Sequence, residues 1–233
     1  MLDTEKVSYR AIRDEITRRI ARREWAPGEL IPGEEALAAE FGAARATVNR
    51  ALQDMARSGL VERKRKAGTR VARGRLREAR FLIPLVRDEI ETRGAAYRYA
   101  LLSSAIEKAP DIVRARMGLA PKAQTLHLRC LHLADGLPYQ FEDRWINLEA
   151  VPAARQESFE SIGPNEWLVN NAPFSEAEFG MFAAAASVDD AELLQIRPGD
   201  PVFVAERVTR LMEKPVTLVR MVHPQSHRVT IRF

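Results

Sequence analysis

Residues 45–59 read RATVNRALQDMARSG, and their spacing predicts a short helix with a polar exposed surface. Val48, Leu52 and Met55 recur at i, i+4 and i+7, which places them on one narrow apolar face. Four polar or basic residues of the first two turns fall outside that face and are expected on the solvent side: Arg45, Thr47, Asn49 and Arg50. Gly59 is expected to end the helix.

Two further helices are predicted before this one. The first ends before the Pro27–Gly28 turn, and its apolar stripe, spaced by three and four residues, consists of Tyr9, Ile12, Ile16 and Ile20. The second spans residues 34–41, and Gly42 suits the left-handed conformation that ends many helices. A short turn then leads into residues 45–59.

After the third helix, residues 60–72 read LVERKRKAGTRVA and predict a β-hairpin. Its two β-rich runs flank an Ala67–Gly68 turn, and its tip consists of Lys64, Arg65, Lys66 and Gly68. Helix, helix, turn, helix and basic hairpin are the elements of a winged helix-turn-helix.

This order of elements indicates DNA binding. A recognition helix enters the major groove with its exposed N-terminal turns, where asparagine can bond adenine and arginine can bond guanine. Threonine can contact a phosphate or a thymine methyl, and a cationic hairpin can follow the phosphates with little sequence reading. We therefore expect DNA contacts from the four polar helix residues and the four hairpin-tip residues. The alternative is a solvated helix face beside a charged linker.

The charge distribution supports the same assignment. The whole chain has 36 Lys and Arg against 32 Asp and Glu, a net charge of only +4. Residues 1–75 hold 17 basic and 11 acidic side chains, so 17 − 11 = +6, and the remainder is −2. Residues 63–77 contain eight basic residues and no acid, which makes them the candidate linker. We expect a DNA-binding domain over 1–75 and a second domain over 76–233.

Composition narrows the class of protein. With 233 residues, 46% of them hydrophobic and 29% charged, the chain is long enough for two small domains. Its one cysteine, Cys130, excludes an intramolecular disulfide framework and suits a reducing compartment. The start, MLDTEKVSYRAI, lacks the apolar core of a signal peptide, and no stretch approaches the roughly 18 apolar residues of a membrane span. A cytoplasmic location is expected.

The second half predicts an α+β domain with a mostly antiparallel sheet. Residues 124–148 read QTLHLRCLHLADGLPYQFEDRWINL, two alternating runs around the Asp135–Gly136 turn of a hairpin. Helices are predicted before this hairpin in DIVRARMGLA and after it in SVDDAELLQI, where Ser187 is the expected cap. Further strands are predicted over 200–211, 214–224 and 227–233.

Functional side chains concentrate on this hairpin. Gln140, Glu142 and Arg144 alternate along one strand and so project from one face of the sheet. The opposing strand offers one of three basic residues, depending on the register: His127, Arg129 or His132. Charges paired across strands could also be solvent-facing ion pairs. No two of the four histidines form an i, i+4 pair on a predicted helix, so we expect no metal site and no cofactor. Without an elbow or triad pattern, we expect no enzyme.

The first 72 residues resemble the DNA-binding domain of the GntR family of bacterial repressors. The resemblance covers residues 8–72 and rests on Pro32 before the second helix, on the R-x-T-V-x-x-A-L pattern from Arg45 to Leu52, and on the G-T of the hairpin. It implies DNA contacts at Arg45, Thr47, Asn49 and the hairpin tip. Three positions depart from the family pattern, each at a common phosphate contact: Gly33, Glu35 and Ala44.

Residues from roughly 80 to 233 resemble a chorismate-lyase-like effector-binding domain of one GntR subfamily. Within it, RCLHLADGLPYQFEDRWIN, SIGPNEWL and VTLVRMVHPQSHRV are similar to the histidine-utilisation repressors. The resemblance implies a repressor of histidine-degradation genes that is released by urocanate. The position of His132 is commonly arginine in relatives that sense sugar phosphates, so histidine there disfavours a phosphate ligand.

Urocanate joins an imidazole to a carboxylate, and the hairpin offers groups for both. Arg144 and Arg220 are candidates for the carboxylate, and Glu142 is a candidate for the imidazole. We expect His132, Tyr139 and Asn165 to complete the site. Arg220 could instead form an ion pair at the sheet edge, and Tyr139 could pack in the core.

Three functions remain open on sequence alone. The first is a ligand-released transcriptional repressor, and the second is a regulator of the same family that senses another small acid or a sugar phosphate. The third is an enzyme with a DNA-binding appendage. For either regulator we expect a homodimer joined through the C-terminal sheets, because two heads can then read a palindromic operator about one DNA turn apart.

Overall fold

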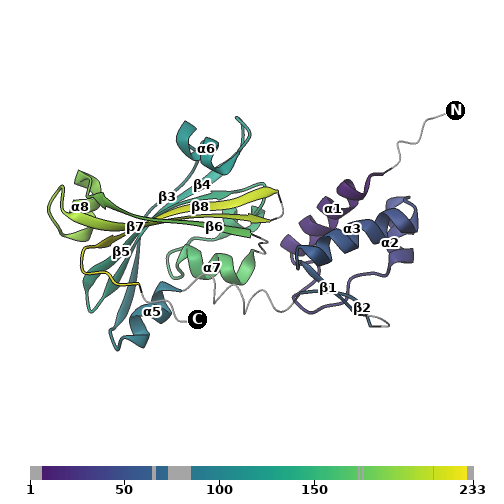
Figure 1. The fold of residues 1–233 in the computed structure, drawn as a ribbon, viewed down its shortest axis with the longest axis horizontal. Coiled ribbons are helices and arrows are strands. Elements are labelled where there is room, and N and C mark those ends of the chain that lie inside the picture. Colours follow the sequence, from purple (N-terminus) through teal and green to yellow (C-terminus); the bar gives the residue numbers. More distant parts are fainter. Residues whose placement is uncertain are drawn as a thin grey trace. The chain divides into compact units, whose positions relative to one another are not determined.

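The computed structural model describes residues 7–64, 67–72, 85–172, 174, 176–211 and 213–229. Backbone contacts divide the chain into an N-terminal unit, residues 1–82 with 173–175, and a C-terminal unit, residues 83–172 with 176–233. In the described part of the chain, no helix combines the length and apolar character needed to cross a membrane. Figure 1 shows the two units.

The N-terminal unit is the predicted winged helix-turn-helix. Its elements are α1 (Tyr9–Ala21), α2 (Glu34–Phe41), α3 (Arg45–Arg57), β1 (Val61–Lys64) and β2 (Gly68–Val71). The hydroxyl of Ser8 caps α1 by accepting from the backbone N–H of Ala11 at 3.2 Å. Gly42 ends α2 in the left-handed region at φ 59°, as its position predicted.

One apolar core joins the three helices. Ile12 and Ile16 of α1 are fully buried, as are Val48 and Met55 of α3, so the periodic residues of both helices supply the core. In the hairpin, Gly68 adopts φ +79°, and a Cβ there would lie 2.9 Å from Cδ2 of Leu30. Glycine is therefore required at this corner both by backbone conformation and by space.

The C-terminal unit is built on a six-stranded antiparallel sheet with the order β3–β4–β5–β8–β7–β6. The strands are β3 (Tyr97–Glu107), β4 (Thr125–Ala134), β5 (Leu137–Asn147), β6 (Glu176–Ala185), β7 (Pro201–Leu211) and β8 (Lys214–Pro224). Asp135 and Gly136 form the predicted tight turn with φ 51° and 83°. The helices are α5 (Val86–Thr92), α6 (Asp111–Met117), the 3-10 turn Pro152–Gln156, α7 (Pro164–Asn171) and α8 (Val188–Leu194).

Helices cover both faces of this sheet (Figure 1). On one face, Ala191 and Leu194 of α8 pack against Phe141, Val204 and Val222. Met117 of α6 packs on the same face against a separate cluster that contains Trp145, Val208 and Leu218. The other face lies under α7 and α5, and its polar side chains form the candidate effector site.

The predicted capping of α8 is confirmed. The Ser187 hydroxyl accepts from the backbone N–H of Asp190 at 3.0 Å, and the Asp190 carboxylate accepts from the backbone N–H of Ser187 at 3.4 Å. Two other expectations change. Residues 227–229 are not a strand, and the rest of the strand predicted over 227–233 lies outside the described residues. Within the candidate linker, Arg63 and Lys64 belong to β1 and Gly68–Val71 form β2, while residues 65, 66 and 73–84 lie outside the described part of the chain.

Candidate functional site

The polar residues predicted on α3 lie on its solvent side. The Arg45 side chain is 63% exposed, and Arg50 is also exposed, whereas Thr47 and Asn49 are half-buried. The Arg50 guanidinium carbon lies 4.2 Å from the centre of the Tyr9 ring, which holds that side chain against α1. The first two turns of α3 therefore present one amide, one hydroxyl and two guanidinium groups.

Glu34, at the start of α2, links the predicted DNA contacts. Its Oε1 accepts from Asn49 Nδ2 at 2.7 Å and from Arg63 Nη2 at 2.5 Å. Its Oε2 accepts from Arg45 Nε at 3.2 Å. The neighbouring Glu35 carboxylate lies 3.0 Å from Arg45 Nη1. A nucleic acid would have to replace the bonds of Asn49 and Arg45, because these two donors are among the groups expected to contact DNA.

Sequence reasoning did not identify Glu34 as part of this surface. A glutamate in the first turn of a helix is ordinarily explained by the helix dipole. Its second role appears only when α2, α3 and β1 are packed together. At the hairpin tip, Lys64 and Gly68 are exposed. Arg65 and Lys66, also predicted to contact DNA, lie outside the described residues.

The second candidate site is a buried group on the α7 side of the sheet, here called the polar cluster: His132, Glu142, Arg144, Asn165 and Arg207. Glu142 Oε1 accepts from Arg144 Nε at 2.6 Å, and its Oε2 lies 3.2 Å from His132 Nε2. These three side chains are at most 3% exposed. Burial alone raises the pKa of Glu142, but Arg144 and His132 outweigh burial and lower it to about 2.

Two arginines of the polar cluster converge on Asn165 of α7. Arg144 Nη2 lies 3.5 Å from Asn165 Oδ1, and Arg207 Nη2 donates to the same oxygen. Arg144 and Arg207 both lie opposite Val219 of the intervening strand, so they occupy one row of the sheet. Arg207 was not predicted, because its face depends on a register that spans three strands.

Tyrosines and the start of α7 enclose His132. Tyr97 Oη lies 3.0 Å from His132 Nδ1, and Tyr99 Oη donates to the carbonyl of Phe159 at 2.9 Å. A Cβ on Gly163, the residue before α7, would lie 3.5 Å from His132 Cε1. The histidine therefore has the Glu142 carboxylate on one ring nitrogen and a phenol on the other.

A chain of contacts leads from the polar cluster to α5, the first element described after residue 72. The Arg87 guanidinium carbon of α5 lies 4.6 Å from the centre of the Tyr97 ring. Arg87 Nε lies 3.4 Å from Oε2 of Glu166, the residue that follows Asn165 in α7. Arg87 therefore connects α5 both to Tyr97 and to α7.

The structure places the other predicted effector residues on different faces of the sheet or against different partners. Gln140 is buried and shares the face of Glu142 and Arg144, as its alternation predicted. Arg220 lies on the opposite face in a two-bond ion pair with Asp190, at 2.8 Å for both bonds, so it is not part of the polar cluster. The Tyr139 hydroxyl donates to Glu89 at 2.6 Å, and its ring packs edge-on against His223.

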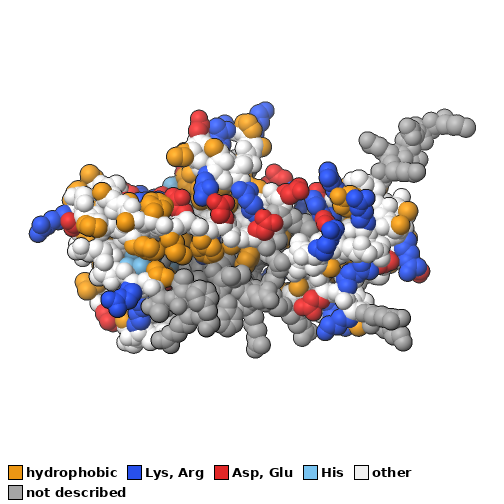
Figure 2. Space-filling view, in the orientation of Figure 1, with side chains coloured by type: hydrophobic (Ala, Val, Ile, Leu, Met, Phe, Trp, Pro, Cys, Tyr) orange, Lys and Arg blue, Asp and Glu red, His pale blue; other side chains and the backbone are white. Residues whose placement is uncertain are grey.

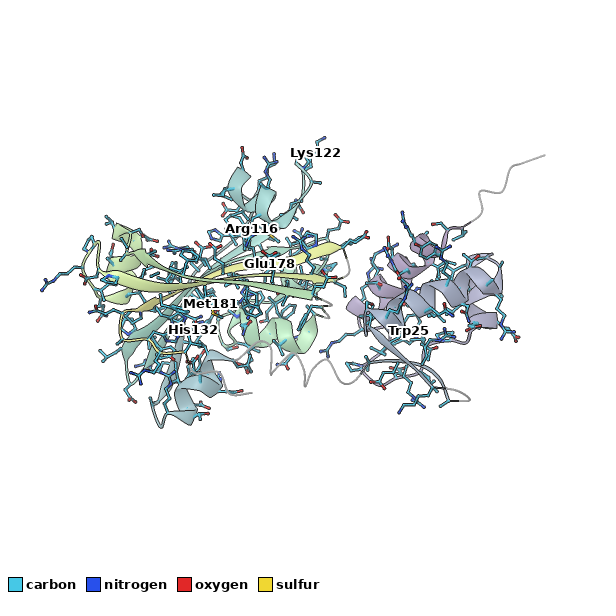
Figure 3. All side chains as sticks on the ribbon, viewed as in Figure 1. Trp25, Arg116, Lys122, His132, Glu178 and Met181 are labelled. Carbon is cyan, nitrogen blue, oxygen red and sulfur yellow. The ribbon has the colours of Figure 1, made fainter. Side chains whose placement is uncertain are left out.

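The register that the sequence left open is now fixed. His132 lies opposite Gln140 and joins the polar cluster. His127 lies on the opposite face, where its ring stacks on Trp145 at 3.9 Å and its Nε2 lies 2.9 Å from Asp143. Arg129, also on that face, pairs with Asp189. Figure 3 shows Arg116 and Glu178 on the α6 side of the sheet and His132 and Met181 on the other side.

Comparisons with known proteins place the chain in a family. Residues 8–71 match the gntR family of bacterial regulatory proteins, and residues 92–228 match the UTRA domain. The chain belongs to the GntR family. It is a GntR-type transcriptional regulator whose C-terminal unit is a UTRA domain, as the residues of both halves predicted.

Several relatives of this GntR regulator are repressors. It is 31% identical to the histidine utilization repressor of Pseudomonas putida, over 97% of this chain and 91% of that protein. It is 29% identical to the histidine utilization repressor of Klebsiella aerogenes, over 97% and 94%. The repressor NagR of Bacillus subtilis is 25% identical over 87% of this chain and 84% of its own.

Solved structures agree with the fold. The C-terminal domain of the histidine utilization repressor from Pseudomonas syringae aligns with a TM-score of 0.56 and 29% identity, over 59% of this chain and 99% of that one. PhnF from Mycobacterium smegmatis aligns with a TM-score of 0.56 and 21% identity, over 94% and 96%. The second likeness concerns the fold alone.

Proposed function

We propose that this protein represses histidine-degradation genes and that urocanate releases it from its operator. The observation that carries the proposal is the polar cluster, which places a buried carboxylate, a histidine and two arginines around the start of α7. The similarity to histidine utilization repressors over 97% of the chain supports the same ligand chemistry.

The two ends of urocanate match the two halves of the polar cluster. Its imidazole can bond Glu142 and His132, and its carboxylate can bond a guanidinium on the Asn165 side. The members of the polar cluster are bonded to one another. A ligand must therefore replace some of these bonds, which couples its binding to movement of α7.

Thermal unfolding of the purified protein tests the ligand. A compound that binds only the folded state, present at a concentration of about 100 times its Kd, adds about 2.7 kcal/mol to the free energy of unfolding. We expect urocanate to raise Tm and a sugar phosphate to leave it unchanged. The reverse result would favour a regulator of the same family with a different effector, and turnover of urocanate would favour an enzyme.

DNA recognition is proposed to use Arg45, Thr47, Asn49 and Arg50 of α3 together with the hairpin tip. We expect Asn49→Ala to weaken binding to operator DNA by about 1 to 3 kcal/mol, because an asparagine amide reads a base edge. Binding to random-sequence DNA should change little. Fluorescence anisotropy on both DNAs measures the difference, with an operator selected by the protein from a random pool.

Lys64→Ala is the matched control for this prediction. Lys64 is exposed at the hairpin, where it is expected to contact a phosphate. Its loss should weaken binding to both DNAs equally and reduce the salt dependence by roughly one unit. If Asn49→Ala also weakens both DNAs equally, Asn49 is a backbone contact.

We further propose a homodimer joined through the edge strand β6. Among the described strands β6 pairs only with β7, and its exposed large apolar residues are Phe179, Met181 and Phe182. Figure 2 shows hydrophobic side chains gathered along this part of the C-terminal unit. The opposite edge, β3, is interrupted by an irregularity after Leu101, a feature that protects edges from pairing. A two-fold axis through β6 would extend the sheet across two copies.

Met181→Lys is expected to convert the dimer to a monomer, because a lysine on an edge strand opposes pairing. Sedimentation velocity at micromolar concentration measures the change. Leu102→Lys on the other edge, where Leu102 is 41% exposed, is the matched control and should leave the dimer intact. A wild-type protein that sediments as a monomer with and without operator DNA contradicts the proposal.

A further inference from the structure

Arg207 of β7 is a buried cation that forms no ion pair with a carboxylate of the described residues. Its side chain belongs to a residue only 3% exposed, and it contacts Asn165 through Nη2. Its Nε has no hydrogen-bond partner among the described residues. A polar atom that is buried without a partner is expensive and calls for an explanation in a native structure.

The nearby carboxylate does not neutralise Arg207. Glu142 is bonded to Arg144 Nε at 2.6 Å and lies 3.2 Å from His132. The polar cluster therefore contains two guanidinium groups and one carboxylate. Burial lowers the pKa of Arg207 to about 9, and the positive charge of Arg144 acts in the same direction. Arg207 still carries its proton at neutral pH, so one positive charge remains unbalanced.

Two neighbouring features suit an anion at this position. Asn165, which accepts from Arg207, lies in the first turn of the eight-residue helix α7, where the helix dipole is positive. The ring centre of Phe179 lies 5.5 Å from the Arg207 guanidinium carbon, so an apolar surface adjoins the charge. A flat acid could place its carboxylate on Arg207 and its apolar part beside this ring.

We propose that Arg207 is the residue that makes the effector site select a small planar acid with a single negative charge. The inference rests on the proposed function, because it concerns the same site. One carboxylate would balance the one unpaired cation and would accept from the unsatisfied Nε. A neutral analogue of the same shape would leave Arg207 as it is in the free protein.

The first arm of the test needs no ligand. Arg207→Met keeps an unbranched, largely apolar side chain and removes the guanidinium and its charge, so we expect Tm of the protein without added ligand to rise. Arg220→Met is the matched control, because it breaks the ion pair with Asp190 on the opposite face and should lower Tm. A lower Tm for Arg207→Met would show that the guanidinium is structural and would overturn the inference.

The second arm compares urocanate with its amide, which has the same skeleton and no charge. Calorimetry should show wild-type protein binding the acid roughly 10- to 100-fold more tightly than the amide, because a charged hydrogen-bond pair is lost with the amide. In Arg207→Met the two affinities should become equal, and in Arg220→Met the preference should persist. An undiminished preference in Arg207→Met overturns the inference.

The two proposals can fail separately. If wild-type protein binds neither urocanate nor its amide while Arg207→Met raises Tm, the proposed effector is wrong and the unbalanced cation is supported. If wild-type protein binds urocanate and Arg207→Met neither raises Tm nor loses the preference for the acid, the proposed function is supported and the role of Arg207 is overturned.

Discussion

Arg144→Met is expected to lower the free energy of unfolding of the C-terminal unit by about 3 to 5 kcal/mol, because it leaves a buried carboxylate without its cation. Glu142 and Arg144 are 1% and 0% exposed, and Arg144 also donates from Nη1 to Thr217 Oγ1 at 3.3 Å. Urea denaturation followed by tryptophan fluorescence measures the loss, since Trp145 and Trp167 lie in this unit.

A double variant separates charge from packing. Glu142→Gln with Arg144→Met removes both charges, so it should recover part of the stability lost in Arg144→Met alone. Equal losses in the single and double variants would assign the effect to packing. Arg144→Met is expected to lower stability and Arg207→Met to raise it, although each removes one guanidinium from the same row of the sheet. Comparing the two variants therefore shows whether the balance of charge decides the effect.

The Glu142 ion pair also predicts a response to acid. The folded state lowers the pKa of Glu142 from 4.5 to about 2, so the carboxylate contributes its full stability above pH 4.5. That contribution should disappear as the pH falls from 4.5 towards 2, where the folded protein takes up the proton. Glu142→Gln should therefore flatten the acid limb of the stability profile, and an unchanged limb would contradict the ion pair.

Urocanate is expected to lower operator affinity 5- to 150-fold, which corresponds to a coupling free energy of about 1 to 3 kcal/mol. The physical reason is that urocanate would bond side chains of the polar cluster that are otherwise bonded to one another. It would therefore favour an arrangement in which α7 has moved. Anisotropy titrations of operator with and without urocanate measure the ratio. Linkage requires that operator weaken urocanate binding by the same factor, which calorimetry tests independently.

Arg87→Met tests whether α5 carries the coupling. Arg87 contacts Tyr97 and Glu166, which adjoin the polar cluster. We expect the variant to bind urocanate as wild type does and to bind operator as tightly, but to release it less on addition of urocanate. Urocanate affinity that is equal with and without operator in wild-type protein would exclude urocanate as the inducer.

The sequence was sufficient for the N-terminal unit because its signals are local. Helix periodicity and the Gly42 cap each depend on residues within one or two turns. The hairpin of the C-terminal unit and the capping of α8 are predictable for the same reason. The two edge strands β3 and β6 were not predicted, because most of their side chains are exposed on both faces and show no alternation.

The residues of the polar cluster also differ in whether local sequence signals could place them. Alternation along one strand is a property of the sequence, and it placed Gln140, Glu142 and Arg144 on a common face. Asn165 was named through the PNEWL motif, and its position beside both arginines required α7 to be packed on the sheet.

Only the tertiary structure decided which partners join those residues. A two-residue turn at Asp135–Gly136 would place His132 opposite Tyr139, on the face away from Glu142. An irregularity between His132 and Leu133 shifts the register, so His132 lies opposite Gln140 and faces Glu142. The pairing of β5 with β8 and of β8 with β7 places Arg207 in the polar cluster and Arg220 on the opposite face of the sheet. The sequence determined the face of each side chain within a strand, and non-local pairing determined which faces coincide.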